Sequence, residues 1–202
     1  MGVKERRERE EGGRLSAILA AAEHIFSVQG YNQARMDDIA AAAELSKGTL
    51  YYYFKSKDEI FFHLMHQEIR KLHEEILRRI EGKTSFLDIL EEWIDFYLEY
   101  FDKNTIYLRM FLPFMAGFIK FGKACGRRKP IRPEREWRTL RDKLRQAVRR
   151  EHLPFDIEAM LQFLQTLQIG IGLKLLEGDK AGARASGRFF FKLMKRMMED
   201  QS

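Results

Sequence analysis

Cysteine is nearly absent from this chain of 202 residues, which contains only Cys125. A single cysteine excludes an internal disulfide and is typical of proteins in a reducing compartment, so we expect a cytoplasmic location. A lone thiol with no second cysteine to resolve it is more often unremarkable than a redox sensor. The first residues are charged and contain no apolar core of the kind found in secretion signals, so no signal peptide is expected.

Long apolar runs are also lacking. The longest, Met110–Ile119, is too short to span a bilayer, and no membrane partner is expected. No segment shows the strict alternation of a half-buried strand, whereas apolar residues recur at helical spacing along most of the chain. We therefore predict an all-α fold of about nine helices, and the 45% apolar content is sufficient for a buried core.

Signs of catalysis and metal binding are scarce. No nucleophile lies near a histidine in a recognisable motif, so the sequence does not predict an enzyme. His63 and His66 are three residues apart, but no third ligand accompanies them at a typical spacing. No metal and no cofactor are expected.

Positive charge is unevenly distributed. The net charge is +6, and residues 120–150 carry thirteen basic and three acidic side chains. A solvated basic surface is the simpler interpretation of this block. A site for an anionic ligand group, such as the phosphates of an acyl-coenzyme A, remains open as the alternative.

The most informative stretch begins at Ser46, a residue suited to start a helix. Leu50 and Phe54 share one face of that helix, which leaves three successive tyrosines to be distributed over the others. A second short helix precedes it from Met36, and the brief turn between them is typical of a helix-turn-helix. That motif lays its second helix in the major groove of DNA, where phenol and lysine side chains suit phosphates and thymine methyl groups.

These residues resemble a known family. Gly30-Tyr31, Ile39-Ala40 and the run Leu45–Lys57 are similar to the N-terminal domain of TetR-family transcriptional regulators, over roughly residues 14–62. The resemblance implies a dimeric regulator, most simply a repressor, that binds a palindromic operator in double-stranded DNA. It also implies a response to a small hydrophobic effector, for which an acyl or acyl-coenzyme A-like compound is one candidate. It also implies DNA contacts by Arg35, Met36, Ser46, Lys47, Gly48, Thr49, Tyr51, Tyr52, Tyr53 and Lys57.

Two positions depart from the family pattern. Arg35 stands where the family commonly has a capping Ser or Thr, and arginine cannot accept the N–H bond, so this helix start is expected to be weaker by about 1 kcal/mol. Glu44 stands where glycine is frequent, so it must tolerate the backbone angles of the turn.

The resemblance also divides the chain. It implies a flexible arm over residues 1–13, a DNA-binding domain over 14–57 and a ligand-binding and dimerisation domain over 58–202. Aromatic and methionine side chains at helical spacing are either simple core or the wall of an effector pocket: Trp93, Tyr97, Tyr107, Met110, Phe111, Phe114, Met115 and Phe118. The last two helices are expected to pair with their copies in a second subunit through Leu161, Leu164, Gln168, Ile171, Phe190, Leu193, Met194 and Met197.

Two other functions remain as alternatives. A DNA-binding protein of the nucleoid type would use the same helix-turn-helix without an effector. An enzyme would use the aromatic segment as a substrate cavity, although no catalytic group supports it.

Overall fold

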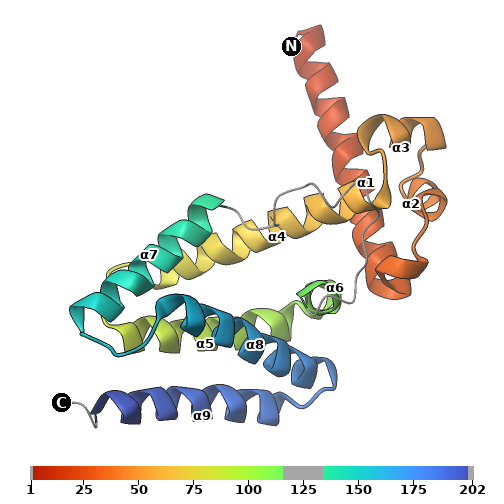
Figure 1. Cartoon of the computed structure of the whole chain (residues 1–202). Helices are drawn as coiled ribbons and strands as arrows, with labels where there is room; N and C mark the ends of the chain where they lie inside the picture. The colour runs from red at the N-terminus through yellow and green to blue at the C-terminus, as the bar shows by residue number, and fades with distance from the viewer. Residues whose placement is uncertain (1, 116–133, 200–202) are drawn as a thin grey trace. The chain divides into compact units, whose positions relative to one another are not determined.

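A computed structural model describes residues 2–115 and 134–199. Every regular element in these ranges is an α-helix, which confirms the predicted all-α fold. The helices are α1 (Val3–Gln33), α2 (Met36–Ala42), α3 (Lys47–Tyr53), α4 (Lys57–Arg79), α5 (Phe86–Lys103), α6 (Thr105–Met115), α7 (Glu134–Arg150), α8 (Ile157–Leu176) and α9 (Lys180–Glu199) (Figure 1).

The described residues form two compact units, one up to Gln67 and one from Glu68 onward. The division falls inside α4, whose first residue coincides with the end of the predicted DNA-binding domain. Each unit has its own buried side chains and is described by itself.

In the first unit, α1 begins at Val3, so the segment expected to be a flexible arm is helical. Local pairs explain the difference: the Glu5 carboxylate accepts the Gly2 N–H at 3.0 Å, and Arg6 pairs with Glu10 at 2.9 Å. Such contacts along one helix face offset part of the cost of two consecutive glycines. Gly30, with φ of 77°, then interrupts α1 in a backbone conformation that favours glycine.

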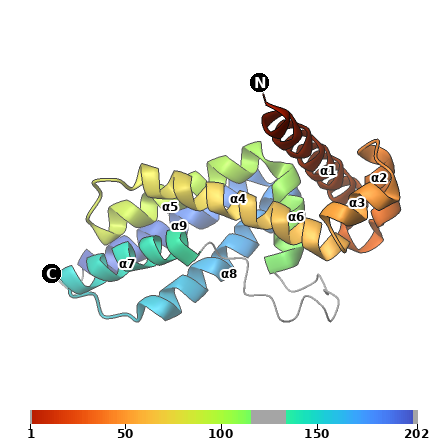
Figure 2. The same cartoon turned by 90° about the horizontal axis from the view of Figure 1, so that it is seen from above.

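An aromatic cluster joins α1 to α4 in this unit. The ring of Tyr31 lies 5.7 Å from Phe26 and 4.9 Å from Phe61, and both phenylalanines are buried. Ile18, Ile39 and Leu50 in the same unit are fully buried as well. Helices α1, α2 and α3 contact one another in sequence order, α1 with α2 and α2 with α3 (Figure 2).

The turn between α2 and α3 has an unfavourable residue at its tightest point. Glu44 adopts φ of 55°, in the left-handed region that the glycine-rich family pattern led us to expect. A side chain with a Cβ atom is strained there by about 1–2 kcal/mol.

We therefore expect Glu44→Gly to raise the free energy of unfolding by about 1 kcal/mol relative to Glu44→Ala. Both variants lose the carboxylate, but only glycine relieves the backbone strain. Urea unfolding of the two proteins measures the difference. Equal stability of the two variants would show that the turn relaxes without strain.

In the second unit, α5, α8 and α9 contact one another, while α6 and α7 pack against α5 and α8 (Figure 1). Helix α5 contributes the largest share of the core, because nine of its residues are buried. Gly172 permits the close approach of α6 and α8, since a Cβ atom there would lie 2.8 Å from a methyl group of Leu112. Helix α6 continues through Pro113, although a proline inside a helix usually kinks or breaks it, and the described helix ends at Met115.

Candidate nucleic-acid interface

The predicted recognition helix is α3, and its start is capped. The Ser46 hydroxyl accepts the backbone N–H of Thr49 at 3.2 Å. Leu50 and Phe54 are buried, as their spacing predicted. Tyr51 and Tyr52 are exposed, while Tyr53 is half-buried and lies edge-on to Tyr52 with ring centroids 5.3 Å apart. The arrangement therefore combines an anchored inner face with phenol groups at the surface.

The segments that precede α3 present the other predicted contacts. Arg35 is exposed at the N-cap of α2 and makes no capping hydrogen bond with its side chain, as expected for arginine. Met36 and Thr49 are half-buried. Gly48 is exposed, and a Cβ atom there would meet only the Ser46 hydroxyl at 3.9 Å, so the backbone is open to close approach. Their contacts with DNA stay predictions.

Lys47 has a partner that sequence reasoning missed. Its ammonium pairs with the Asp37 carboxylate at 2.7 Å, and both side chains are largely exposed. An exposed pair of this kind contributes about 0–1 kcal/mol, so Lys47 can exchange Asp37 for a phosphate at little cost. The signal was present: an acid in the first turn of one helix and a lysine at the start of the next.

The two lysines that follow α3, Lys55 and Lys57, donate hydrogen bonds to backbone carbonyls at helix ends. The Lys55 ammonium donates to the carbonyl of Tyr51 at 2.8 Å, at the end of α3. The Lys57 ammonium donates to the carbonyls of Tyr31, Asn32 and Ala34 at 2.9, 3.0 and 3.0 Å. Lys57, predicted to contact phosphate, is thus directed into the protein.

A small pocket lies between α5 and α8 in the second unit. Its enclosed volume is about 10 Å³, and it is lined by Trp93, Ile94, Tyr97, Leu164, Leu167, Gln168 and Ile171. Ligand pockets usually measure about 300–1,000 Å³, so a bulky effector would have to displace these side chains. Trp93 and Tyr97 were predicted to line a pocket, whereas Leu164, Gln168 and Ile171 were predicted to face a second subunit.

The remaining predicted pocket residues lie elsewhere. Met110 is buried and Tyr107 packs against the core at half-burial. The side chains of Phe111, Phe114 and Met115, and Phe118 as a whole, lie outside the described residues.

Tyr97 is one of the two polar residues that line this pocket, the other being Gln168. Its hydroxyl donates to the backbone carbonyl of Gln168 at 2.9 Å, and burial raises the pKa of this phenol well above its usual value. The phenol therefore acts as a neutral donor that joins α5 to α8.

This environment predicts a loss of stability at high pH. Below about pH 10 the Tyr97 phenol is protonated in both states, but above it the unfolded chain loses the proton first. The free energy of unfolding should then fall by up to about 1.4 kcal/mol per pH unit through this group. Tyr97→Phe should flatten the pH profile of urea unfolding between pH 9.5 and 11 (approximate limits of the titration), and exposed Tyr52→Phe is the control. A profile that is the same in Tyr97→Phe and the native protein contradicts this.

The predicted dimer face is largely internal. Leu161, Leu164, Ile171, Phe190 and Met194 are buried within one chain. Gln168 is half-buried, and only two of the eight predicted residues are well exposed. The apolar side chains of α8 and α9 that do remain exposed form what we call the outer α8–α9 set: Phe163, Leu173, Phe189, Leu193 and Met197.

Helix α8 also has the length and apolar composition of a membrane-spanning helix, the one such case among the described helices. Core helices of soluble proteins pass the same test, and α8 packs against α5, α6 and α9. Its exposed face belongs to the outer α8–α9 set.

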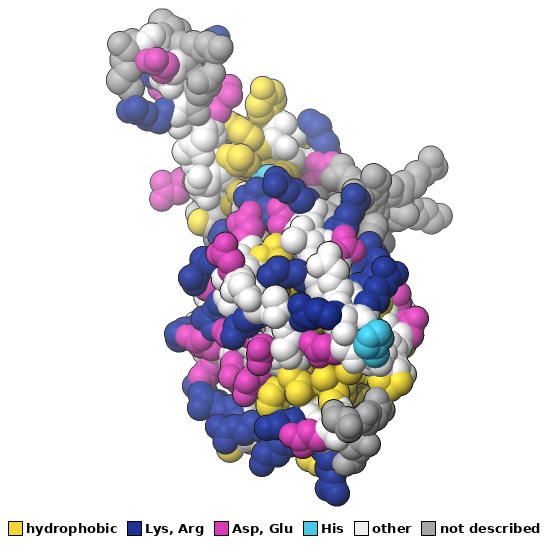
Figure 3. All heavy atoms as spheres, turned by 90° about the vertical axis from the view of Figure 1, so that its left-hand side faces the viewer, with side chains coloured by type: hydrophobic (Ala, Val, Ile, Leu, Met, Phe, Trp, Pro, Cys, Tyr) yellow, Lys and Arg dark blue, Asp and Glu magenta, His cyan; other side chains and the backbone are white. Residues whose placement is uncertain are grey.

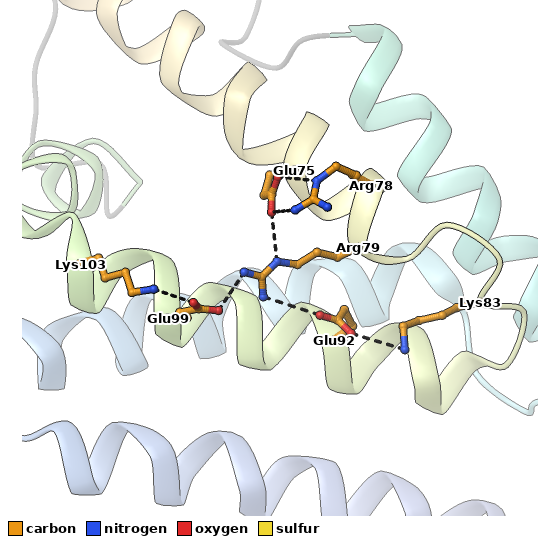
Figure 4. A network of polar contacts seen from close by, with 7 residues as sticks. All are labelled: Glu75, Arg78, Arg79, Lys83, Glu92, Glu99 and Lys103. Atoms are coloured by element: carbon orange, nitrogen blue, oxygen red, sulfur yellow. Dashed lines mark hydrogen bonds and ion pairs between the residues drawn. The ribbon is translucent and has the colours of Figure 1, made fainter.

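A network of ion pairs joins the end of α4 to α5 (Figure 4). Arg79 bonds Glu75 at 3.2 Å and Glu99 at 2.8 Å, and its guanidinium lies 4.9 Å from the centroid of the Phe96 ring. Hydrogen bonds from Lys103, and then from Arg79, lower the pKa of Glu99 to about 2. Most of these groups are partly exposed, so the network mainly fixes the orientation of Arg79 across the two helices.

The histidines and acidic side chains were also considered as candidate metal sites. Within residues 2–115 and 134–199, no group of three or more His, Cys, Asp or Glu side chains could hold a metal ion. Burial, and then the charge of His66, lowers the pKa of His63, which also lies edge-on to Phe54.

The described part of the basic block is α7, whose Arg135, Arg138 and Arg149 are exposed. Figure 3 shows a face on which basic and acidic side chains are interspersed. The first half of the block, Lys120 to Pro133, and Cys125 lie outside the described residues.

Part of the chain matches a protein family model and several known proteins. Residues 18–64 match the family model described as bacterial regulatory proteins, tetR family. The chain is 32% identical over 110 residues to the HTH-type transcriptional regulator QacR of Staphylococcus aureus, covering 46% of this chain and 58% of that protein. It is 34% identical over 79 residues to the fatty acid metabolism regulator protein of Bacillus subtilis, covering 37% and 41%.

The chain thus spans less than two thirds of the length of these curated relatives. Among solved structures, the fold is similar to that of the transcriptional regulator FadR from Bacillus subtilis in complex with stearoyl-CoA. The TM-score is 0.68 at 16% identity, covering 86% of this chain and 95% of that one. At this identity the likeness concerns the fold.

Proposed function

We propose that the chain, whose residues 18–64 match the model of the tetR family of bacterial regulatory proteins, is a transcriptional regulator that binds operator DNA. The observation that carries this proposal is the capped helix α3, which follows α2 after a short turn and exposes Lys47, Tyr51 and Tyr52. A helix with an anchored inner face and exposed phenol and ammonium groups suits the major groove and its flanking phosphates.

The regulator acts as a homodimer in this proposal. The outer α8–α9 set is a group of exposed apolar side chains with no cover in one chain. A symmetric pairing of α8 and α9 with a second copy would bury it, as in a four-helix bundle. Two copies of α3 would then read the two halves of a palindrome about 34–36 Å apart, or a multiple of that spacing.

The second unit is proposed to bind a small hydrophobic effector that releases the protein from DNA, which makes it a repressor. The apolar pocket between α5 and α8 supports this role, and the polar groups at its wall are Tyr97 and Gln168. A relative is named a fatty acid metabolism regulator, and a protein of similar fold is titled in complex with stearoyl-CoA. A long acyl chain or its coenzyme A ester is therefore the proposed class, and the proposal includes no catalytic role. The site of action is the cytoplasm, where the DNA is.

DNA binding by the purified protein tests the proposal. Fragments from the region upstream of its own gene should be retarded, and the logarithm of the binding constant should fall linearly with the logarithm of salt concentration, by about 0.9 per phosphate contact. Palmitoyl-CoA should weaken this binding and raise the melting temperature, whereas coenzyme A alone should do neither.

Retardation that does not respond to palmitoyl-CoA would favour a ligand-independent DNA-binding protein. Binding that is absent, or insensitive to salt, would contradict the proposed function itself.

A further inference from the structure

The first turn of α4 is attached to the end of α1 through Lys57. A lysine ammonium has three donors, and in Lys57 each has a carbonyl acceptor, in Tyr31, Asn32 and Ala34. These carbonyls belong to the end of α1, where helical partners are missing and the helix dipole favours a cation. Lys57 therefore caps α1 from another helix.

Tyr31 makes the attachment two-sided. The Lys57 ammonium lies 4.8 Å from the centroid of its ring, and the Tyr31 hydroxyl donates to the carboxylate of Asp58. The same ring packs between Phe26 and Phe61. Two consecutive charged residues of α4 thus contact Tyr31 of α1. Lys57 contacts the face of the ring and the backbone carbonyl, and Asp58 accepts a hydrogen bond from the hydroxyl.

The chain continues from this point directly into the helix-turn-helix. Ala34, whose carbonyl binds Lys57, is followed by Arg35, the N-cap of α2, and α3 packs on α2. The position of α2 and α3 relative to α4 therefore depends on these bonds. To reach a phosphate, Lys57 would have to leave three carbonyls, two of them in part-buried hydrogen bonds, without their donor.

We propose that Lys57 and Asp58 clamp α4 to the corner between α1 and α2, and that Lys57 is a positioning residue for α3 and not a phosphate ligand. The inference rests on the proposed function, because it concerns DNA binding. Helix α4 continues past Gln67 into the second unit.

The test uses Lys57→Arg and Lys57→Met, with Lys55→Arg and Lys55→Met as matched controls. Lys55 is two residues away and caps only one carbonyl. Arginine binds phosphate at least as well as lysine, but a planar guanidinium does not fit three carbonyls that converge on one point. We expect both Lys57 variants to lower operator affinity about tenfold and to melt earlier, with the salt slope unchanged.

A phosphate ligand would behave differently. Lys57→Arg would then bind operator like the native protein. In Lys57→Met, the slope of the logarithm of the binding constant against the logarithm of salt concentration would decrease by about 0.9 for each bound subunit, without a change in melting temperature. That result would overturn the clamp. Lys55→Arg should melt and bind like the native protein in either case.

Tyr31→Phe provides a second test in case the Lys57 variants do not fold. It removes only the hydroxyl that donates a hydrogen bond to the Asp58 carboxylate, and it leaves every charge in place. We expect a several-fold loss of operator affinity with an unchanged salt slope, and native affinity would overturn the proposal. If the native protein binds no operator, the proposed function fails, while the clamp is still judged by the melting of Lys57→Arg against Lys55→Arg.

Discussion

Replacing Phe189 with glutamate is expected to convert the protein into monomers and to abolish operator binding. Phe189 is 70% exposed on α9, and Leu193 and Met197 follow it at helical spacing on the same side. In the proposed dimer, each Phe189 ring contributes about 1.5–3 kcal/mol on burial, and a buried carboxylate in its place costs several kcal/mol more. Since the symmetric interface contains the change twice, the dimer should weaken by at least about a thousandfold.

Analytical ultracentrifugation over a range of concentrations measures this effect, and circular dichroism checks that the variant is folded. Val28→Glu is the matched control, because Val28 is 69% exposed and lies on α1, outside the outer α8–α9 set. It should leave the dimer intact. A folded Phe189→Glu dimer with native operator affinity would mean that the subunits pair through another surface.

The sequence predicted the helices of this fold well, because their periodicity and caps are local. Ser46 caps the helix that it was expected to start, and Asp156 caps α8 in the same way, each accepting an N–H group three residues later. The tight turn at Glu44 was likewise visible, since the family pattern indicated a position that favours glycine. Each of these features depends on residues only a few positions apart.

The inner and outer faces of α8 could not be separated in the same way. Apolar residues surround most of this helix, so spacing alone does not say which of them meet α5 and α9. Leu161 and Leu164 are buried, whereas Phe163 between them is half exposed. A helix with an apolar outer face is expected where a second copy covers it, and a single sequence does not distinguish that face from the core.

Lys57 shows the other limit of sequence reasoning. The family resemblance predicted a DNA contact for Lys57, which stays a prediction, but no sequence pattern indicated that its ammonium binds carbonyls more than twenty residues earlier in the chain. The spacing of Tyr31 and Lys57 in the sequence does not predict that contact, because the contact depends on how α1 and α4 pack. The pair of Lys47 and Asp37 is different, because an acid and a lysine at the starts of successive helices do suggest it, although the contact still requires α2 and α3 to pack together.

Replacing Tyr52 with alanine is expected to reduce operator binding strongly and to leave the fold unchanged. The side chain is 74% exposed, and the one ring contact found for it in the described part of the chain is the edge contact with Tyr53. Its loss should therefore change the free energy of unfolding by no more than about 0.5 kcal/mol. A base contact is worth about 1–3 kcal/mol, and the proposed dimer has two, so the affinity should fall by at least tenfold.

Tyr52→Phe separates the two chemistries that a phenol offers. If the ring packs on a thymine methyl group, Tyr52→Phe keeps most of the affinity, whereas a hydroxyl bonded to phosphate makes it as weak as Tyr52→Ala. Because tyrosine is neutral, neither variant should alter the salt slope by the 0.9 or so of a lost cationic contact. Fluorescence anisotropy with a labelled operator at several salt concentrations measures both quantities. A marked loss of stability with native affinity per folded molecule would mean that Tyr52 belongs to the packed face of α3 and that the reading surface lies elsewhere.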